Sequence, residues 1–467
     1  MPLWFYWFDA IKHLRPACSR GRTFLWFMVC VMGMTLRTEH LGVTSIVRAL
    51  GLHEKYYQNL LDNFHSTAIK LSLMTVLWVK LVLRLFSNPV KINGRLVLVG
   101  DGLKIPKSGK KMPGVKRLHQ SSESNTKPEF ISGHSLQAVS LLVEANNSVL
   151  AVPLIAKIHE GIVLSNRDKR TLLDKMIVLL SGLDINQPYY FVADAYYACQ
   201  KITRGLLDKQ QHLITRAKSN AVAYEPYLHK GSPKVGRPKV YGNKIALSSL
   251  FKRQRGWEYA SSPVYGEDDV TLQFQTVDLL WRPAGQRVRF VAVIHPNRGR
   301  CLLMSTDTSL SALEIIKIYG LRFKIEFSFK QAVHVIGTFA YHFWIKAMKP
   351  LRRRQGNQYL HRETAEYRDK VHKKIHAYHV FIFAGLVAQG LLQYLSACHP
   401  TVVWKHFGSW LRTIRPGVAP SERVVAMALR QHCPEFLLSN LQNNNLAKFI
   451  GERQAPDRMG FFAVASG

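Results

Sequence analysis

The sequence predicts an α/β core interrupted by a β-rich insertion, with a helical region at each end of the chain. Residues 1–90 place apolar side chains at helical spacing. From residue 91, short apolar runs rich in β-forming residues alternate with helical stretches, and after residue 218 strand-like runs follow each other directly. We therefore divide the chain into 1–90, 91–218, 219–300, 301–346 and 347–467.

The helical N-terminal part ends at Asn88-Pro89, because proline does not continue a helix. Within it, residues 41–64 predict two helical segments on either side of Gly51. Two helices around a glycine-containing turn are typical of a helix-turn-helix DNA reader, but an ordinary helical hairpin has the same pattern. We interpret this part as DNA-binding and keep the hairpin as the alternative.

Two apolar runs predict buried strands of the core, RLVLVG at residues 95–100 and YYFVA at residues 189–193. Helical stretches are expected at 170–180 and 198–207. Strands that alternate with helices in this way indicate an α/β core.

The predicted insertion opens with a basic stretch, because residues 230–255 carry eight Lys or Arg and no acid. Residues 309–346 then predict one long helix, with Thr308 or Ser309 as its N-cap. The C-terminal part is mostly helical and suited to dimerisation. The strand-like runs of the insertion lie at 270–277, 288–294 and 301–305.

The composition excludes several classes of protein. A hydrophobic content of 47% excludes a mainly disordered chain. Six cysteines without a CxxC pair exclude a secreted disulfide scaffold and fit a reducing cytoplasm. The 64 Lys and Arg exceed the 30 Asp and Glu, and the net charge of +34 favours a polyanionic partner, either nucleic acid or an anionic membrane.

The membrane is the weaker of these two partners. The apolar run at 24–36 has only 13 residues, whereas about 20 are needed to span a bilayer. The run at 71–86 is interrupted by Lys80 and Arg84, and the run at 377–397 contains two glutamines. We interpret all three as buried helices and expect nucleic acid, without a membrane, as the partner.

Two acids directly follow the predicted core strands, Asp101 after RLVLVG and Asp194 after YYFVA. Ligands and catalysis gather at strand ends of α/β sheets, because side chains there project from a rigid edge. Two carboxylates at such an edge offer the hard oxygen ligands that divalent cations prefer. The alternative is that each aspartate only caps the following turn.

The predicted long helix supplies a third acid. At about 100° per residue, four polar residues share one narrow face of this helix. They are Tyr319, Arg322, Glu326 and Lys330. The face belongs either to a functional site or to a solvated surface, on which ion pairs between these residues contribute only about 0.2–0.5 kcal/mol each.

The order of the three acids resembles a known family. Asp101, Asp194 and Glu326 follow one another at spacings of 93 and 132 residues. This pattern is similar to that of the DDE transposases of bacterial insertion sequences, and in particular to their cut-and-paste group. The segments VGDG, FVADAYYA and LRFKIEFSFK are similar to the three motif regions of that family.

The helix signature of that group is Tyr, two residues, Arg, three residues, Glu, six residues, Lys. Tyr319, Arg322 and Glu326 match it position for position. Val333 stands where the lysine is expected, so we assign the missing positive charge to Lys330, one turn after the glutamate.

The resemblance implies an RNase H-like core with a β-rich insertion and two-metal chemistry. Asp101, Asp194 and Glu326 would be the catalytic residues and would bind two Mg²⁺ ions, for which Mn²⁺ substitutes. Arg322 would hold a DNA phosphate bidentately, Lys330 would place a point charge beside it, and Tyr319 would hydrogen-bond a phosphate oxygen.

The resemblance also implies the partners and the compartment. The enzyme would cleave and transfer strands of double-stranded DNA, at the terminal inverted repeats of the element and in the target DNA. Nicking, hairpin formation and hairpin opening would precede strand transfer. A homodimer would pair the two ends, in the bacterial cytoplasm at the nucleoid.

Three basic stretches predict a DNA path towards the acids. Residues 104–127 carry seven Lys or Arg against one Glu, although a solvated loop is the alternative there. The string GRPK at 236–239 resembles a minor-groove hook, and residues 346–374, with ten Lys or Arg and three acids, suit phosphate contact. The residues expected at the DNA in these stretches are Lys104, Lys110, Lys111, Arg237 and Arg353.

Two further groups of residues allow two interpretations each. Trp257 and Trp281 lie where the resembling family stacks a flipped base, and each is otherwise a core residue. His372, His376 and His379 share a helical face, but they lack a cysteine or carboxylate cluster, so we expect phosphate contact or packing rather than zinc.

The predicted function is therefore metal-dependent cut-and-paste DNA transposition. The alternative is a non-catalytic DNA-binding protein or repressor derived from a transposase, which Val333 favours. A membrane-surface binder is the third hypothesis, and it rests only on charge and on the apolar runs.

Overall fold

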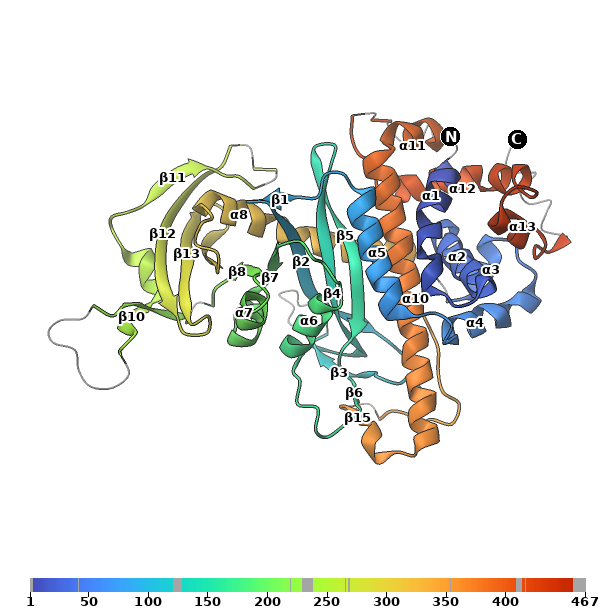
Figure 1. The fold of residues 1–467 in the computed structure, drawn as a ribbon, viewed down its shortest axis with the longest axis horizontal. Coiled ribbons are helices and arrows are strands. Elements are labelled where there is room, and N and C mark those ends of the chain that lie inside the picture. The colour runs from blue at the N-terminus through green and yellow to red at the C-terminus, as the bar shows by residue number, and fades with distance from the viewer. Residues whose placement is uncertain are drawn as a thin grey trace.

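The computed structural model describes residues 3–40, 42–120, 128–218, 220–228, 238–264, 266–267, 269–352, 354–408, 414–415 and 417–456. A large mixed sheet occupies the middle of the molecule. Figure 1 shows a helical body on one side of this sheet and a set of antiparallel strands at its other end.

Helices from both ends of the chain form one body. The N-terminal helices are α1 (Leu3–Ile11), α2 (Gly21–Leu36), α3 (Thr44–Ala49), α4 (Tyr57–His65) and α5 (Leu71–Leu85), with 3-10 turns η1 (Lys12–Ala17) and η2 (Glu54–Tyr56). The C-terminal helices are α10 (Ala365–Cys398), α11 (Pro400–Phe407), α12 (Glu422–Ser439) and α13 (Asn445–Gly451). Trp4 Nε1 donates to Leu429 O at 2.9 Å, and Arg430 Nε donates to Leu36 O at 2.7 Å. The helices from the two ends of the sequence therefore pack against each other.

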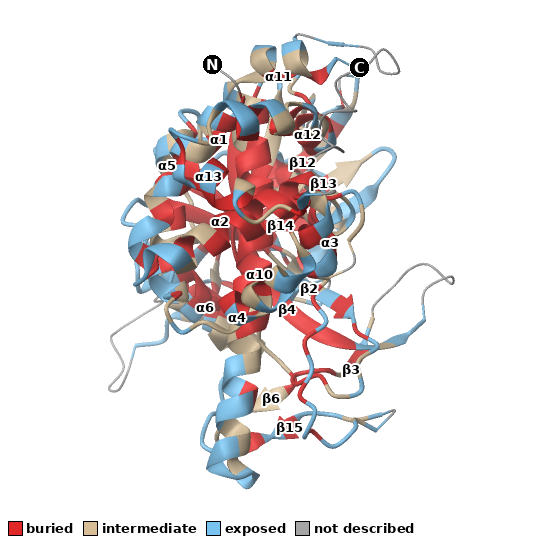
Figure 2. Ribbon diagram, turned by 90° about the vertical axis from the view of Figure 1, so that its right-hand side faces the viewer, coloured by how far each residue is buried: buried red, intermediate tan, exposed pale blue. Residues whose placement is uncertain are grey.

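Helix α10 passes through the centre of this body. Figure 2 shows its exposed N-terminal turns and its buried continuation. At Gly390 a Cβ would lie 2.3 Å from the ring of Trp78, so glycine permits the close approach of α10 to α5. By length and composition α10 could cross a membrane, but 89% of its apolar window is buried inside the protein, so this is weak evidence for a span. The apolar runs at 24–36, 71–86 and 377–397 form α2, α5 and part of α10.

The core of the sheet contains the two strands that the apolar runs predict. Its strands are β2 (Arg95–Pro106), β4 (Phe130–Ala145), β5 (Ser148–Ile158), β7 (Tyr189–Ala193) and β8 (His212–Arg216), with β1 (Lys91–Ile92) and β3 (Lys116–His119) at its margins. Strands β2, β7 and β8 are parallel, whereas β4 pairs antiparallel with β2 and β5. Helices α6 (Leu172–Ser181) and α7 (Gln200–Leu207) precede and follow β7, as expected. The two-stranded pair β6 (Ile162–Val163) and β15 (Gln358–Tyr359) lies apart from the main sheet.

The remaining strands extend the same sheet. They are β9 (Val222–Pro226), β10 (Tyr241–Ala246), β11 (Glu258–Ser261), β12 (Thr271–Trp281), β13 (Gln286–His295) and β14 (Gly299–Ser305), with the 3-10 turn η4 (Leu247–Lys252). We call these strands the antiparallel extension. Strand β14 pairs with β8, so the strand order is β10-β9-β12-β13-β14-β8-β7-β2-β4-β3. The three runs predicted as strands are β12, β13 and β14.

The long helix expected at 309–346 is shorter than predicted. It begins with Ser311 as N-cap in a capping box with Glu314, rather than at Thr308 or Ser309. It continues through α8 (Ala312–Gly320), η5 (Leu321–Phe323), α9 (Lys324–Gln331) and the π-helical η6 (Ala332–Ile336). Gly337 then adopts a left-handed conformation with φ +67°, which ends the helix.

The residues after Gly337 leave the helix because they pack into the core. Tyr341 and Phe343 are buried, and their rings stack on Tyr378 of α10 at centroid distances of 4.7 Å and 6.0 Å. Burial of these aromatic rings outweighs the local helical pattern. The helix prediction is wrong for residues 337–346.

Candidate active site

The pairing of β2 with β7 places the two aspartates side by side. Val99 and Val192 are partners in this parallel pair, and Asp101 and Asp194 each lie two residues further along. Neighbouring strands are about 4.8 Å apart, and an even step keeps side chains on one face. The two carboxylates therefore lie near each other at the C-terminal end of β7.

The prediction that Asp101 ends its strand is wrong. Strand β2 continues to Pro106 in antiparallel pairing with β4, well beyond the last residue of β7. Asp194 does follow its strand and caps the 3-10 turn η3 (Ala195–Tyr197), where its Oδ1 accepts from Tyr196 N at 3.1 Å. The capping interpretation of Asp194 is thus correct as far as the turn is concerned.

Glu326, the third acid, lies on α9 and is linked to Asp101 by the side chain of Arg322. Arg322 Nη1 lies 3.3 Å from Asp101 Oδ2, and Arg322 Nη2 lies 2.7 Å from Glu326 Oε1. One guanidinium therefore bridges two of the three predicted catalytic acids. The ion pair expected for a solvated helix face is present, but it also reaches across to the sheet.

Burial governs the protonation of the two aspartates. Burial raises the pKa of Asp101 to about 6, the Gly102 amide and Arg322 oppose the rise, and Asp194 and Glu326 add to it. Burial also raises the pKa of Asp194, against the Tyr196 amide and Arg322 and with Glu326. Since repulsion between the acids contributes to both shifts, the cluster favours a cation beside it.

The donor set suits a divalent metal ion, but Arg322 occupies the approach. Oxygen ligands from partly buried carboxylates are what Mg²⁺ and Mn²⁺ prefer. Within the described part of the chain, however, no group of three His, Cys, Asp or Glu side chains is close enough to hold an ion. The residues fit the metal in chemistry, and the guanidinium takes the place of a cation between Asp101 and Glu326.

A cavity of about 560 Å³ opens beside the two aspartates. Its size falls within the range of ordinary ligand sites. Lys104, Lys116 and Arg117 line it, together with Glu160 and the exposed Tyr196. The cavity thus combines the acids with cations suited to phosphate.

Sequence reasoning missed several of these lining residues. Lys116 forms an ion pair with Glu160 at 3.1 Å, and Arg117 lies on β3. They reach the site only because β3 pairs with β4, and no local sequence pattern predicts that pairing. Tyr196 could have been found, because it follows Asp194 by two residues.

The described part of the basic stretch, residues 104–120, is not a solvated loop throughout, because several of its lysines hydrogen-bond backbone carbonyls. Lys104 donates to His119 O at 2.5 Å, and Lys111 donates to Lys346 O at 2.8 Å. Lys107 is buried, hydrogen-bonds the carbonyls of Phe339 and Tyr341, and lies over the Tyr341 ring. Lys110 is exposed, and residues 121–127 are outside the described residues.

The other residues of the helix signature have different environments. Tyr319 is half-buried among apolar side chains, and burial raises the pKa of its hydroxyl. Lys330 is exposed and contacts none of the acids in the described part of the structure. Val333 packs against the main core, which explains how an apolar residue fits at the lysine's position.

Two predicted DNA contacts cannot be placed, and both tryptophans have core environments. Arg237 and Arg353 lie outside the described residues. Trp281 is buried. Trp257 packs against the core, and its Nε1 donates to Arg253 O at 2.7 Å.

Comparison with known proteins assigns a family to this fold and site. The family described as DDE superfamily endonuclease matches residues 14–277, more than half of the chain. The matched region contains Asp101 and Asp194 and ends before Glu326. No curated protein matches the chain.

Among solved structures, the piggyBac transposase is similar, in a cryo-EM synaptic complex with hairpin DNA. The two chains share 10% identity at a TM-score of 0.37, over 95% of this chain and 78% of that one. A likeness this weak carries no further argument.

Proposed function

The chain belongs to the DDE superfamily endonucleases, and from this premise we propose that it is a transposase that cuts and joins DNA strands at the ends of a bacterial insertion sequence. The observation that carries the proposal is the meeting of three acids from distant parts of the chain. Asp101, Asp194 and Glu326 influence one another's charge and share Arg322 as a counter-ion.

The architecture supports an RNase H-like catalytic core. Strands β5, β4 and β2 pair antiparallel with one another, and β7 and β8 continue the sheet from β2 in parallel. The antiparallel extension lies between β8 and the helix that carries Glu326, where the resemblance expects a β-rich insertion.

The three acids are the residues that would hold Mg²⁺ or Mn²⁺. Ions bound there would activate a water or a 3′-hydroxyl and stabilise the leaving oxygen of a phosphodiester. Arg322 neutralises Asp101 and Glu326 in the present arrangement. With the acids neutralised by cations, the guanidinium would be free to hold a DNA phosphate bidentately.

Charge and geometry support double-stranded DNA as the partner. The net charge of +34 attracts a polyanion, and Lys104, Lys116 and Arg117 place part of that charge at the cavity of the acids. Cleavage at two paired ends asks for two sites, which a homodimer supplies. Such an enzyme acts in the bacterial cytoplasm, at the nucleoid.

One observation favours the alternative of a non-catalytic DNA-binding protein. Val333 packs against the core where the signature has lysine, and Arg322 forms ion pairs with two of the acids that would bind a metal. A repressor that keeps the scaffold without the chemistry would show both features.

Cleavage of DNA decides between the two functions. A supercoiled plasmid that carries the gene with its natural flanking DNA is incubated with Mg²⁺ and either wild type or Asp101→Asn. The proposed function expects cleavage at the element's ends by wild type and none by the variant. Asp208→Asn, at the exposed end of α7, is the matched control and retains cleavage.

Two results would contradict the assignment. Equal cleavage by wild type and Asp101→Asn removes Asp101 from the site. Specific binding of the ends by wild type without any cleavage, with Mg²⁺ or Mn²⁺, favours the repressor.

A further inference from the structure

A second cavity lies next to the cavity of the acids. It measures about 700 Å³ and lies between the end of β5, the β6 segment, α6 and α10. Glu160 and Leu172 line both cavities, so the second one adjoins the first. Nothing in the site described above uses this space.

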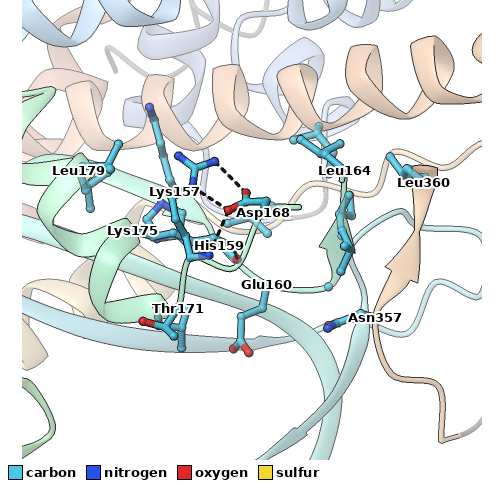
Figure 3. A pocket seen from close by; sticks show the side chains of 18 of the residues that line it. Lys157, His159, Glu160, Leu164, Asp168, Thr171, Lys175, Leu179, Asn357 and Leu360 are labelled. Atoms are coloured by element: carbon cyan, nitrogen blue, oxygen red, sulfur yellow. Dashed lines mark hydrogen bonds and ion pairs between the residues drawn. The ribbon is translucent and has the colours of Figure 1, made fainter. Parts of the chain in front are cut away.

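The acids of the second cavity are already paired. Asp168 forms an ion pair with Arg170 at 2.8 Å, and Glu160 pairs with Lys116 of the first cavity at 3.1 Å. Figure 3 shows Glu160 pointing away from Lys157, whose side chain extends towards α10. Neither carboxylate therefore forms an ion pair with Lys157 or Lys175.

Lys157 and Lys175 contribute positive charge to the cavity, which Lys169 and Arg170 also line. Lys175 Nζ donates to the carbonyl of His159 at 2.6 Å and forms no ion pair within the described residues, although its charge lowers the pKa of Glu160 and of Asp168. Lys157 has neither a hydrogen bond nor an ion pair within the described residues, and burial lowers its pKa. An ammonium that is partly buried without an anion is costly, so a bound anion would stabilise it.

Two of the three histidines that line the cavity, His159 and His379, do not compete for this anion as cations. Burial lowers the pKa of His159 to about 4, and nearby Lys175 and Lys157 lower it further. Burial also lowers the pKa of His379 to about 3, and its Nε2 accepts a hydrogen bond from Ile158 N at 3.1 Å. Both rings are neutral at pH 7 and serve as polar walls.

Part of the cavity lining is an apolar wall. This wall consists of Ile162, Leu172, Leu179, Leu360, Val371 and Ile375. The cavity therefore offers both cations and hydrophobic surface, with room for a ligand of moderate size.

We propose that this cavity is a nucleotide-binding subsite, in which Lys157 and Lys175 hold a phosphate and the apolar wall receives the base. The phosphate and base belong to one nucleotide, which comes either from a DNA strand that leaves the neighbouring cavity or from a free nucleotide. The first source rests on the proposed function, whereas the chemistry of the cavity does not.

Calorimetry with dTMP tests the subsite directly, with thymidine as the ligand that lacks phosphate. Wild type binds dTMP more tightly than thymidine, and Lys157→Met weakens dTMP by about tenfold or more, because a charge-assisted hydrogen bond is lost. Lys80→Met, an exposed lysine of α5, is the matched control and binds dTMP as wild type does.

A stability measurement separates binding from a purely structural role of Lys157. Without ligand, Lys157→Met unfolds at a higher temperature than wild type, because methionine keeps the apolar stem and removes the uncompensated ammonium. With saturating dTMP the wild type gains thermal stability and the variant gains little. A variant that is less stable without ligand, yet binds dTMP like wild type, overturns the proposal.

A single-stranded oligonucleotide containing 2-aminopurine identifies the source. If the nucleotide belongs to DNA, dTMP competes with the oligonucleotide and Lys157→Met weakens both. If the oligonucleotide does not compete with dTMP, the subsite takes a free nucleotide. Binding of dTMP requires neither metal nor cleavage, so failure here and failure of the proposed function are observed separately. Absence of dTMP binding by wild type refutes the subsite.

Discussion

Replacement of Asp101 by asparagine is expected to stabilise the metal-free protein at alkaline pH. Burial raises the pKa of Asp101 to about 6 from an ordinary value of 3.8, and its side chain is only 20% exposed. The folded state therefore binds the proton more tightly than the unfolded state. The stability that this provides is complete below pH 3.8 and is lost as the pH rises through about 6.

The magnitude follows from the difference between the two pKa values. At 1.36 kcal/mol for each pH unit, the difference between about 6 and 3.8 corresponds to about 3 kcal/mol. Asparagine, like the protonated acid, carries no charge and avoids this cost. We expect Asp101→Asn to exceed wild type by about 3 kcal/mol at pH 8 and by little at pH 4.

Urea denaturation in EDTA at the two pH values measures this difference. The same Asp208→Asn control should change the free energy of unfolding by less than about 0.5 kcal/mol at both pH values. An Asp101→Asn protein that is no more stable than wild type at pH 8 would refute the electrostatic account of the site. So would an equal gain at pH 4 and pH 8.

Three further predictions concern the counter-ion, the backbone and the DNA. Removal of the bridging guanidinium in Arg322→Ala should lower the melting temperature of the metal-free protein and increase the stabilisation by Mn²⁺, which thermal denaturation with and without the ion measures. An equal effect of Mn²⁺ on both proteins would contradict competition between Arg322 and metal. Gly161 has φ +91°, and a Cβ there would lie 1.9 Å from Gly114 O, so Gly161→Ala should cost more than about 2 kcal/mol in urea denaturation. Affinity for duplex DNA, measured by fluorescence anisotropy, should fall about 10³-fold or more between 50 and 200 mM salt if at least six phosphates are contacted, and a flat profile would argue against a phosphate track.

The meeting of the acids could be anticipated because each had a local signature. Asp101 and Asp194 followed apolar strand-like runs, and parallel neighbours bring such positions together. Glu326 shared a helix face with Arg322, and the structure has that ion pair. Periodicity predicted the positions of the aspartates and the helix face of Glu326, whereas the resemblance to the DDE family implied that the three acids belong to one site.

The parts that could not be anticipated depend on distant partners. The continuation of β2 beyond Asp101 requires β4 as a partner, and β4 begins only at Phe130. The helix end at Gly337 is set by burial of Tyr341 and Phe343 against α10. Lys107 lies in the basic stretch predicted to approach DNA, but it donates to the carbonyls of Phe339 and Tyr341 in the segment after Gly337. Local pattern contains no information about such contacts.

The hydrogen bond between Trp4 and Leu429 has a consequence for biosynthesis. Its two residues are 425 positions apart. At about 5–20 residues per second, a ribosome needs roughly 20 to 85 s to add the partner after Trp4 has been made. During that interval the ribosome has not yet made helix α12, against which α1 packs. A polypeptide released before residue 429 would keep Trp4, Trp7 and their apolar neighbours without cover, and would be a target for chaperones or proteases rather than a shorter DNA-binding protein.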